Sequence, residues 1–194
     1  QHIKCFNEHH DDTKIVVKDT HPKNTNQGNI KVISTEIKDT KTIKAVRLTQ
    51  GKTSINMRDD LGRTIIMTAA ATGKPDELIQ LIEAGANIDV KDYKGITVAM
   101  YATITAQSEC LNILIKQGVD LQTHDSQGRT ALSIAVLKND FAISKILIEN
   151  GANVSHRFKG MSLLMLASTF GFVTMVDLLL KNGADIFYRN PRGK

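Results

Sequence analysis

Two interlocked series of glycines share one period, and this feature constrains the fold more than any other. The glycines of the first series are Gly62, Gly95, Gly128, Gly160 and Gly193. Successive members lie 33, 33, 32 and 33 residues apart. The second series follows the first four members at a distance of 23 residues and consists of Gly85, Gly118, Gly151 and Gly183. A period of this length predicts a solenoid, in which each unit packs only against its neighbours.

The residues around the first series repeat with it. They read Asp-Leu-Gly-Arg-Thr at 60–64, Tyr-Lys-Gly-Ile-Thr at 93–97, Ser-Gln-Gly-Arg-Thr at 126–130 and Phe-Lys-Gly-Met-Ser at 158–162. The glycine fits a turn that needs positive φ, because it has no Cβ to clash with the backbone. The hydroxyl residue after each turn can cap the free amides of a helix. These residues are Thr64, Thr97, Thr130 and Ser162.

Two helices follow each turn. The first carries a small residue for close packing between units, which is Ala69, Ala102, Ala135 or Ala167. The second shows apolar residues at i, i+3 and i+4, as in Leu78, Leu81 and Ile82. Pro75 fits the first turn of such a helix, where its missing amide costs nothing. The second glycine series then predicts helix ends in a left-handed conformation.

Turn, helix, helix, glycine and loop in about 33 residues resemble the ankyrin repeat. The resemblance covers units at 59–91, 92–124, 125–157 and 158–189, with the start of a fifth at 190. The unit ends Gly85-Ala86-Asn87, Gly151-Ala152-Asn153 and Gly183-Ala184-Asp185 agree with it. It implies an all-α fold, an ankyrin-repeat solenoid of helix-turn-helix units joined by β-turn loops.

The chain departs from the family pattern at the start of each first helix. The family's Thr-Pro-Leu-His reads Thr64-Ile-Ile-Met67, Thr97-Val-Ala-Met100, Thr130-Ala-Leu-Ser133 and Ser162-Leu-Leu-Met165. The fourth unit is also one residue shorter in its leading loop and lacks the aspartate of the other three. We therefore expect a distorted loop at 157–159 and less regular hydrogen bonding between units.

The two ends differ from the repeats. Residues 1–30 are polar and aperiodic and predict a flexible tail, whereas 31–58 resemble a degenerate half-repeat that serves as a cap. Residues 190–194 resemble an opening turn without its helices, which favours truncation or a further segment. An uncapped end would also permit self-association. Because no apolar run is long enough for a membrane span, we expect a soluble protein. Because Gln1 rather than Met opens the chain, we expect that a signal peptide or a flanking segment has been removed, so the protein is either exported or cytoplasmic.

Charge and hydropathy argue against two classes of partner. Residues 1–55 hold 10 basic and 6 acidic side chains, whereas 56–194 hold 15 and 14. A nucleic-acid-binding domain would concentrate its basic residues on the folded part together with a known motif, and neither is present. No apolar run approaches the length of a membrane span. We therefore expect neither nucleic acid nor membrane as a partner.

The sequence contains no complete motif for catalysis, for a cofactor or for a metal site. Gly51-Lys52-Thr53 resembles the end of a phosphate-binding loop, but Val46 replaces the glycine that such a loop requires. His124 and His156 fall in loops between units, without a nucleophile motif. The run Glu8-His9-His10-Asp11-Asp12 has ligand-type side chains but no rigid framework to orient them. We expect no enzyme, no cofactor and no metal site.

The family resemblance implies binding through the loop tips and the exposed side of the first helices. The positions that carry it over to this chain are Arg58, Leu61, Arg63, Tyr93, Lys94, Ile96, Ile104, His124, Gln127, Arg129, Lys138, Phe158, Lys159, Met161 and Phe170. Tyr93, Phe158 and Phe170 are the candidate anchors, although local packing is an equal alternative for the two phenylalanines. The mixture of cations and apolar groups predicts a partner protein with an acidic, partly apolar surface.

The sequence is compatible with three functions. The first is a non-catalytic protein-protein interaction module that uses loop tips and the concave face. The second is the targeting domain of a larger enzyme or a secreted effector. The third is a structural or self-associating repeat protein.

Overall fold

A computed structural model of the chain describes residues 55–189, which all lie in one compact unit. The expected tail at 1–30, the expected cap up to residue 54 and the expected fifth unit from 190 lie outside the described residues.

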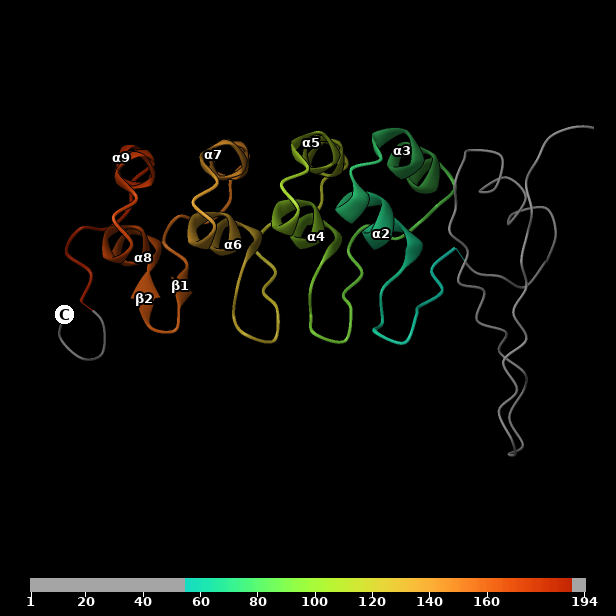
Figure 1. Ribbon diagram of the computed structural model, residues 1–194, viewed down its shortest axis with the longest axis horizontal. Helices are drawn as coiled ribbons and strands as arrows, with labels where there is room; N and C mark the ends of the chain where they lie inside the picture. Colours follow the sequence, from blue (N-terminus) through green and yellow to red (C-terminus); the bar gives the residue numbers. More distant parts are fainter. Residues whose placement is uncertain (1–54, 190–194) are drawn as a thin grey trace, which may run out of the picture. The chain divides into compact units, whose positions relative to one another are not determined.

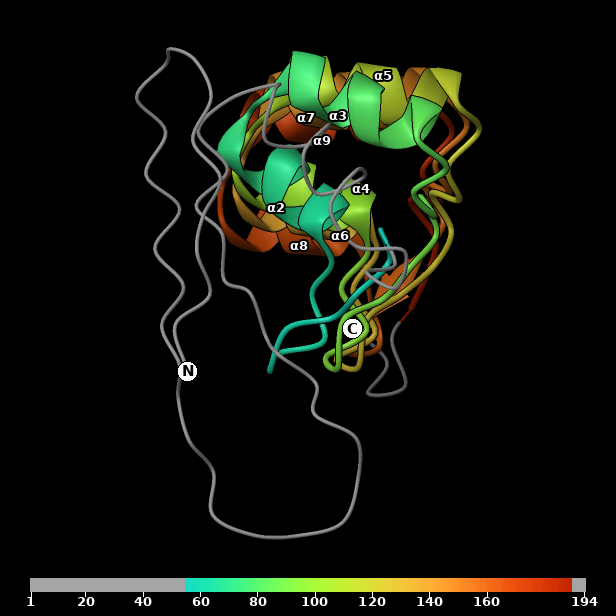
Figure 2. The ribbon, with the colours of Figure 1, turned by 90° about the vertical axis from the view of Figure 1, so that its right-hand side faces the viewer.

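The described helices form two rows, with one helix of each unit in each row (Figure 1). The inner helices are α2 (Ile65–Thr72), α4 (Val98–Ile104), α6 (Ala131–Leu137) and α8 (Leu163–Thr169). The outer helices are α3 (Pro75–Glu83), α5 (Ser108–Lys116), α7 (Phe141–Glu149) and α9 (Val173–Lys181). Figure 2 looks along the stack and shows the turns projecting on the side of the inner row. The predicted solenoid of paired helices is confirmed.

The core lies between the two rows and between successive inner helices. Ala69, Ala102, Ala135 and Ala167 are all buried, which lets each inner helix lie directly against the next. Both rows contribute large side chains to this core, as Leu132 on α6 and Leu111 on α5 do. Because the core continues from unit to unit, no single unit buries its apolar face alone.

The predicted helix caps are confirmed in three units and wrong in the first. Thr97, Thr130 and Ser162 accept hydrogen bonds from the third amide of their helices at 3.2, 3.2 and 3.1 Å. The hydroxyl of Thr64 is buried without a hydrogen-bond partner, and the Sδ atom of Met67 accepts from the Thr64 amide at 3.4 Å instead. A weak sulfur acceptor thus stands where Ser133 provides a hydroxyl in the third unit.

The predicted left-handed glycines are present at every position of both series between residues 55 and 189, with φ between 74° and 86°. The link between inner and outer helix needs the same conformation. Glycine supplies it at Gly73 and Gly171, whereas Ala106 and Asn139 adopt φ of 57° and 53° in the middle units. An L-residue with a Cβ is strained there, and the period of the glycines did not predict these two positions.

The fourth turn is a regular hairpin, so the prediction of a distorted loop at 157–159 is wrong. Strands β1 (Arg157–Phe158) and β2 (Met161–Ser162) pair antiparallel around Lys159 and Gly160. Both of these residues have positive φ, as a tight two-residue hairpin turn requires. The fourth unit, which is one residue shorter than the others, therefore forms a shorter turn of another type.

Hydrogen bonds between the turns change along the stack. The Tyr93 amide donates to the Leu61 carbonyl at 3.1 Å, and the Ser126 amide donates to the Lys94 carbonyl at 2.9 Å. At the next junction the link is a side chain, because His156 Nε2 lies 2.9 Å from the Gly128 carbonyl oxygen. His156 is half-buried at this junction.

Candidate functional site

The candidate surface consists of the turns and the exposed side of the inner helices. In the first three units an aspartate organises the turn, because one carboxylate oxygen accepts from the amides two and four residues later. Oδ1 of Asp92, for example, accepts from Lys94 and Ile96 at 2.8 Å each. The same pair of contacts occurs at Asp59 and Asp125. The shape of each tip is therefore set before any partner binds.

The second carboxylate oxygen has a different partner in the second unit. In the first and third units it accepts from an arginine of the same turn, Arg63 at 2.8 Å or Arg129 at 2.7 Å. The second unit has Ile96 at that position. There the hydroxyl of Tyr101, on α4, donates to Oδ2 of Asp92 at 2.8 Å.

These contacts shift the pKa values of the groups involved. Burial raises the pKa of the Asp125 carboxyl, but hydrogen bonds from Arg129 and Gln127 outweigh burial and hold it below its ordinary value. The Asp59 carboxyl has a lowered pKa for the same balance of causes. Burial, followed by the hydrogen bond to Asp92, raises the pKa of Tyr101 to about 12. The phenol of Tyr101 therefore keeps the proton of its hydrogen bond to Asp92 up to high pH.

Three of the predicted cations are engaged within the protein. Arg63 and Arg129 form ion pairs with their turn aspartates, at 2.8 and 2.6 Å. Arg58 donates to the Gly62 carbonyl at 2.9 Å and also to the carbonyl of Lys91 in the next unit. Their first role is to hold the turns rather than to meet a partner.

The other predicted cations remain available. Lys94, Lys138 and Lys159 are exposed and form no ion pair within residues 55–189. His124 and Gln127 are also exposed. The sequence did not distinguish these free cations from the engaged arginines.

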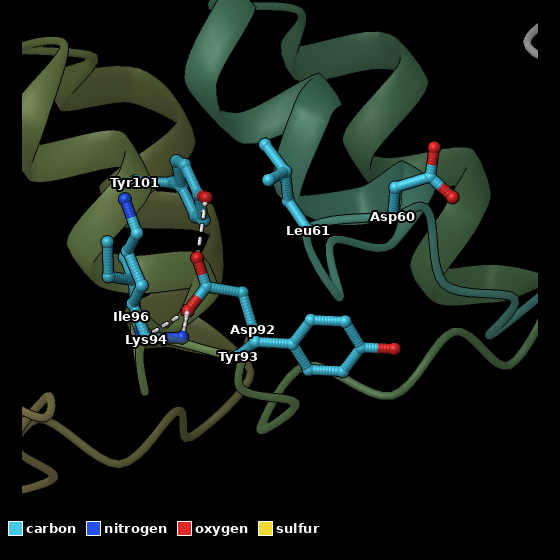
Figure 3. Close-up of a pocket in the computed structure, with 7 residues that line it drawn as sticks. All are labelled: Asp60, Leu61, Asp92, Tyr93, Lys94, Ile96 and Tyr101. Carbon is cyan, nitrogen blue, oxygen red and sulfur yellow. Dashed lines mark hydrogen bonds between the residues drawn. The ribbon is translucent and has the colours of Figure 1, made fainter.

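A shallow pocket opens between the first two turns (Figure 3). Its volume is about 140 Å³. The lining residues, which we call the turn 1–2 pocket, are Asp60, Leu61, Asp92, Tyr93, Lys94, Ile96 and Tyr101. Four of these, Leu61, Tyr93, Lys94 and Ile96, are predicted binding residues that the fold brings together. Tyr93 is 71% exposed.

The Tyr93 ring rests on the backbone of Gly62. A Cβ atom placed on Gly62 would lie 2.6 Å from Cδ1 of Tyr93 and 2.8 Å from its amide nitrogen. A side chain at Gly62 is therefore excluded by close approach as well as by positive φ. Glycine at this position lets the aromatic ring lie flat against the first turn.

One predicted anchor is wrong, because the side chain of Phe158 is only 7% exposed. It belongs to the core, in the same cluster of buried side chains as Leu163 and Ala167. Ile104 and Met161 are half-buried against that core. Phe170 is exposed and stacks on Phe172, with ring centroids 5.5 Å apart.

Sequence reasoning missed Tyr101 as a pocket residue. The signal that could have found it is the isoleucine of the second turn, since Ile96 leaves Asp92 without the arginine that the first and third turns provide. A buried carboxylate needs another donor. Tyr101, five residues further on in α4, supplies it.

Within residues 55–189, no group of three or more His, Cys, Asp or Glu side chains is placed to hold a metal ion. In the same range, no helix has the length and hydropathy needed to cross a membrane.

A family model described as ankyrin repeats in three copies matches residues 33–125 and 107–190. The comparison with curated proteins found no match. The two matched segments together span the turns, both rows of helices and the turn 1–2 pocket.

Proposed function

Because this chain belongs to the ankyrin-repeat family, we propose that it is a non-catalytic module that binds another protein through its turns and the exposed side of its inner helices. Ankyrin repeats are generally protein-protein interaction modules, and the family is typically non-catalytic. Stacked units of this kind present an extended, preformed face to a partner.

The single observation that carries the proposal is the exposed, supported ring of Tyr93. An aromatic side chain held against Gly62 at the edge of a pocket loses little conformational entropy when a partner covers it. Leu61, beside it, is also exposed. Side chains of this type supply much of the affinity in protein interfaces, about 2 kcal/mol each when fully desolvated.

Charge supports an acidic partner. The free cations Lys94, Lys138 and Lys159 lie on the turns and the ends of the inner helices. The outer helix α3 instead begins with Asp76 and Glu77. An acidic partner would therefore be steered toward the turn side, where exposed lysines raise the association rate more than the final affinity.

The test is affinity capture from a lysate of the source organism with the full chain as bait. Tyr93→Ala and Lys138→Glu should each reduce the amount of a captured protein. The matched control is Phe141→Ala, which removes another exposed aromatic side chain, but from the outer helix α7. Capture that is lost with Phe141→Ala and kept with Tyr93→Ala would place binding on the other face and contradict the proposal.

Self-association is a second candidate, favoured by exposed apolar side chains on and after α9. Val173 and Ile186 are exposed there, and Phe187 is 84% exposed. Exposed apolar side chains that gather into a patch commonly mark an interaction site. Light scattering over a range of concentrations tests it, with Phe187→Asp as the variant. A mass that stays that of a monomer at every concentration would remove this candidate.

A further inference from the structure

We propose that the turn 1–2 pocket accepts one leucine- or phenylalanine-sized side chain of the partner, and that a carboxylate next to that side chain pairs with Lys94. The inference rests on the proposed function and names the chemistry of the segment that this part of the surface recognises.

The size of the pocket sets the size of the group. Its volume of about 140 Å³ is close to the cavity of about 150 Å³ that holds benzene in a protein core. Leu61, Ile96 and the rings of Tyr93 and Tyr101 form its walls (Figure 3). An apolar group of that size would displace water from these walls, whereas an alanine side chain would leave most of the space unfilled.

The buried carboxylate of Asp92 in the pocket does not need a cation from the partner. Asp92 is only 8% exposed, and its oxygens already accept from two amides and the Tyr101 hydroxyl. A carboxylate with three donors is satisfied. The charge preference of the pocket is therefore set at its rim.

The rim holds one free cation and one free anion on different sides. Lys94 and Asp60 are both exposed, and neither has an ion-pair partner among residues 55–189. In Figure 3, Lys94 stands beside Ile96 and Tyr101, whereas Asp60 lies beyond Leu61. A carboxylate on the partner is attracted by Lys94 on one side of the pocket and repelled by Asp60 on the other side.

The next junction lacks this combination and provides an internal control. Between the second and third turns, Ser126 stands at the position of Tyr93, and Arg129 stands at the position of Ile96. Arg129 is engaged with Asp125. The apolar walls that would hold a large side chain at the first junction are therefore missing from the second junction.

The experiment is a titration of the full 194-residue chain, labelled with ¹⁵N, with a synthetic peptide followed by amide chemical shifts. The probe is acetyl-Gly-Ser-Glu-Leu-Glu-Ser-Gly-amide, and the control probe has alanine in place of leucine. The shifts should centre on residues 60–62 and 92–96, and the leucine probe should bind about ten-fold more tightly than the alanine probe.

Protein variants test each part of the pocket separately. Lys94→Ala should weaken binding of the leucine probe about three- to five-fold, and Asp60→Ala should strengthen it about two-fold. Tyr93→Ala should weaken binding at least about ten-fold. Ser126→Ala, the matched change at the next turn, should leave the affinity unchanged.

Equal affinity for the leucine and alanine probes would overturn the proposal, as would shifts centred on Lys138 and Lys159 instead of the pocket. No shift at millimolar peptide, the weak limit of specific binding, would overturn it as well. If one of these results were obtained while affinity capture still depended on Tyr93 and Lys138, the proposed function would remain supported and only the pocket proposal would be wrong. Pocket binding without such capture would instead count against the proposed function.

Discussion

The hydroxyl of Tyr101 donates a 2.8 Å hydrogen bond to Oδ2 of Asp92, which is the contact that Arg63 and Arg129 make to the aspartates of their own turns. One structural task, the support of a turn carboxylate, is thus carried out by two chemically different side chains. The second turn gains an apolar residue at Ile96 as a result, and that residue lines the pocket.

Tyr101→Phe should destabilise the chain by about 1.5 kcal/mol, because it removes a hydrogen bond to a charged group that is buried. Adding Ile96→Arg to this variant should restore part of the loss, since arginine at that position supports the carboxylate in the first and third turns. Urea unfolding measures both effects. A double variant less stable than Tyr101→Phe alone would show that the two supports are not interchangeable.

The phenol of Tyr101 should lose its proton only at high pH. Its pKa is about 12 in the folded chain and about 10 when unfolded, so it stabilises the fold below pH 10 and that stability is lost as the pH rises toward 12. Ultraviolet titration of the tyrosines should show an ionisation near pH 12 that is absent in Tyr101→Phe. An unchanged titration curve in that variant would contradict this assignment.

Arg129→Ala should cost about 2 kcal/mol, whereas Arg63→Ala should cost about 1 kcal/mol or less. The two arginines make the same contact, but the side chain of Asp125 is 1% exposed and that of Asp59 is 37% exposed. Removal of Arg129 leaves a buried carboxylate with fewer donors. Chemical unfolding at pH 7 measures the difference, and equal costs would show that burial of the aspartate is not the deciding factor.

The cost of Arg129→Ala should depend on pH. Because the pKa of Asp125 lies below its ordinary value of 3.8, the paired carboxylate stabilises the fold above that pH, and the contribution is lost as the pH falls through the folded value. The stability difference between wild type and variant should therefore be full at pH 7 and shrink below about pH 4. A difference that grows on acidification would contradict the ion pair as its source.

Gly62→Ala should destabilise the chain by about 1 kcal/mol more than Gly128→Ala. Both glycines have nearly the same positive φ, 78° and 80°, so both variants share the backbone strain. Only at Gly62 does a new Cβ meet a neighbour, which is Tyr93. Thermal unfolding gives the comparison, and Tyr93 should be displaced in the first variant alone. Identical melting temperatures would contradict this steric cost at Gly62, where the Cβ would meet both the ring and the amide nitrogen of Tyr93.

Ala106→Gly should stabilise the chain by about 0.5–1 kcal/mol, because it relieves an L-residue held at φ 57°. The opposite change, Gly171→Ala, should cost about 1 kcal/mol at the equivalent link of the fourth unit, where a Cβ would meet no neighbour. Thermal denaturation of both variants checks the pair. Loss of stability in Ala106→Gly would show that the backbone there is not strained.

Much of the fold could be predicted from local sequence. The two glycine series mark turns and helix ends wherever they occur, because positive φ is a property of the backbone at one residue. The capping hydroxyls of Thr97, Thr130 and Ser162 act within one helical turn. The Thr64 hydroxyl makes no such contact, because the amide of Met67 donates to the Thr64 carbonyl at 3.1 Å instead.

The candidate site could be predicted only in part from local sequence. The sequence by itself determined the repeat, the two rows of helices and the side on which the turns lie, since each follows from contacts within one unit or from its period. The pairing of Arg63 and Arg129 is local, since each contacts the aspartate four residues earlier in its own turn. The tertiary structure decided which other predicted residues are available: it buried Phe158 and left Lys94 and Tyr93 exposed around a pocket. Their burial and exposure depend on side chains from neighbouring turns and helices, which no single segment encodes.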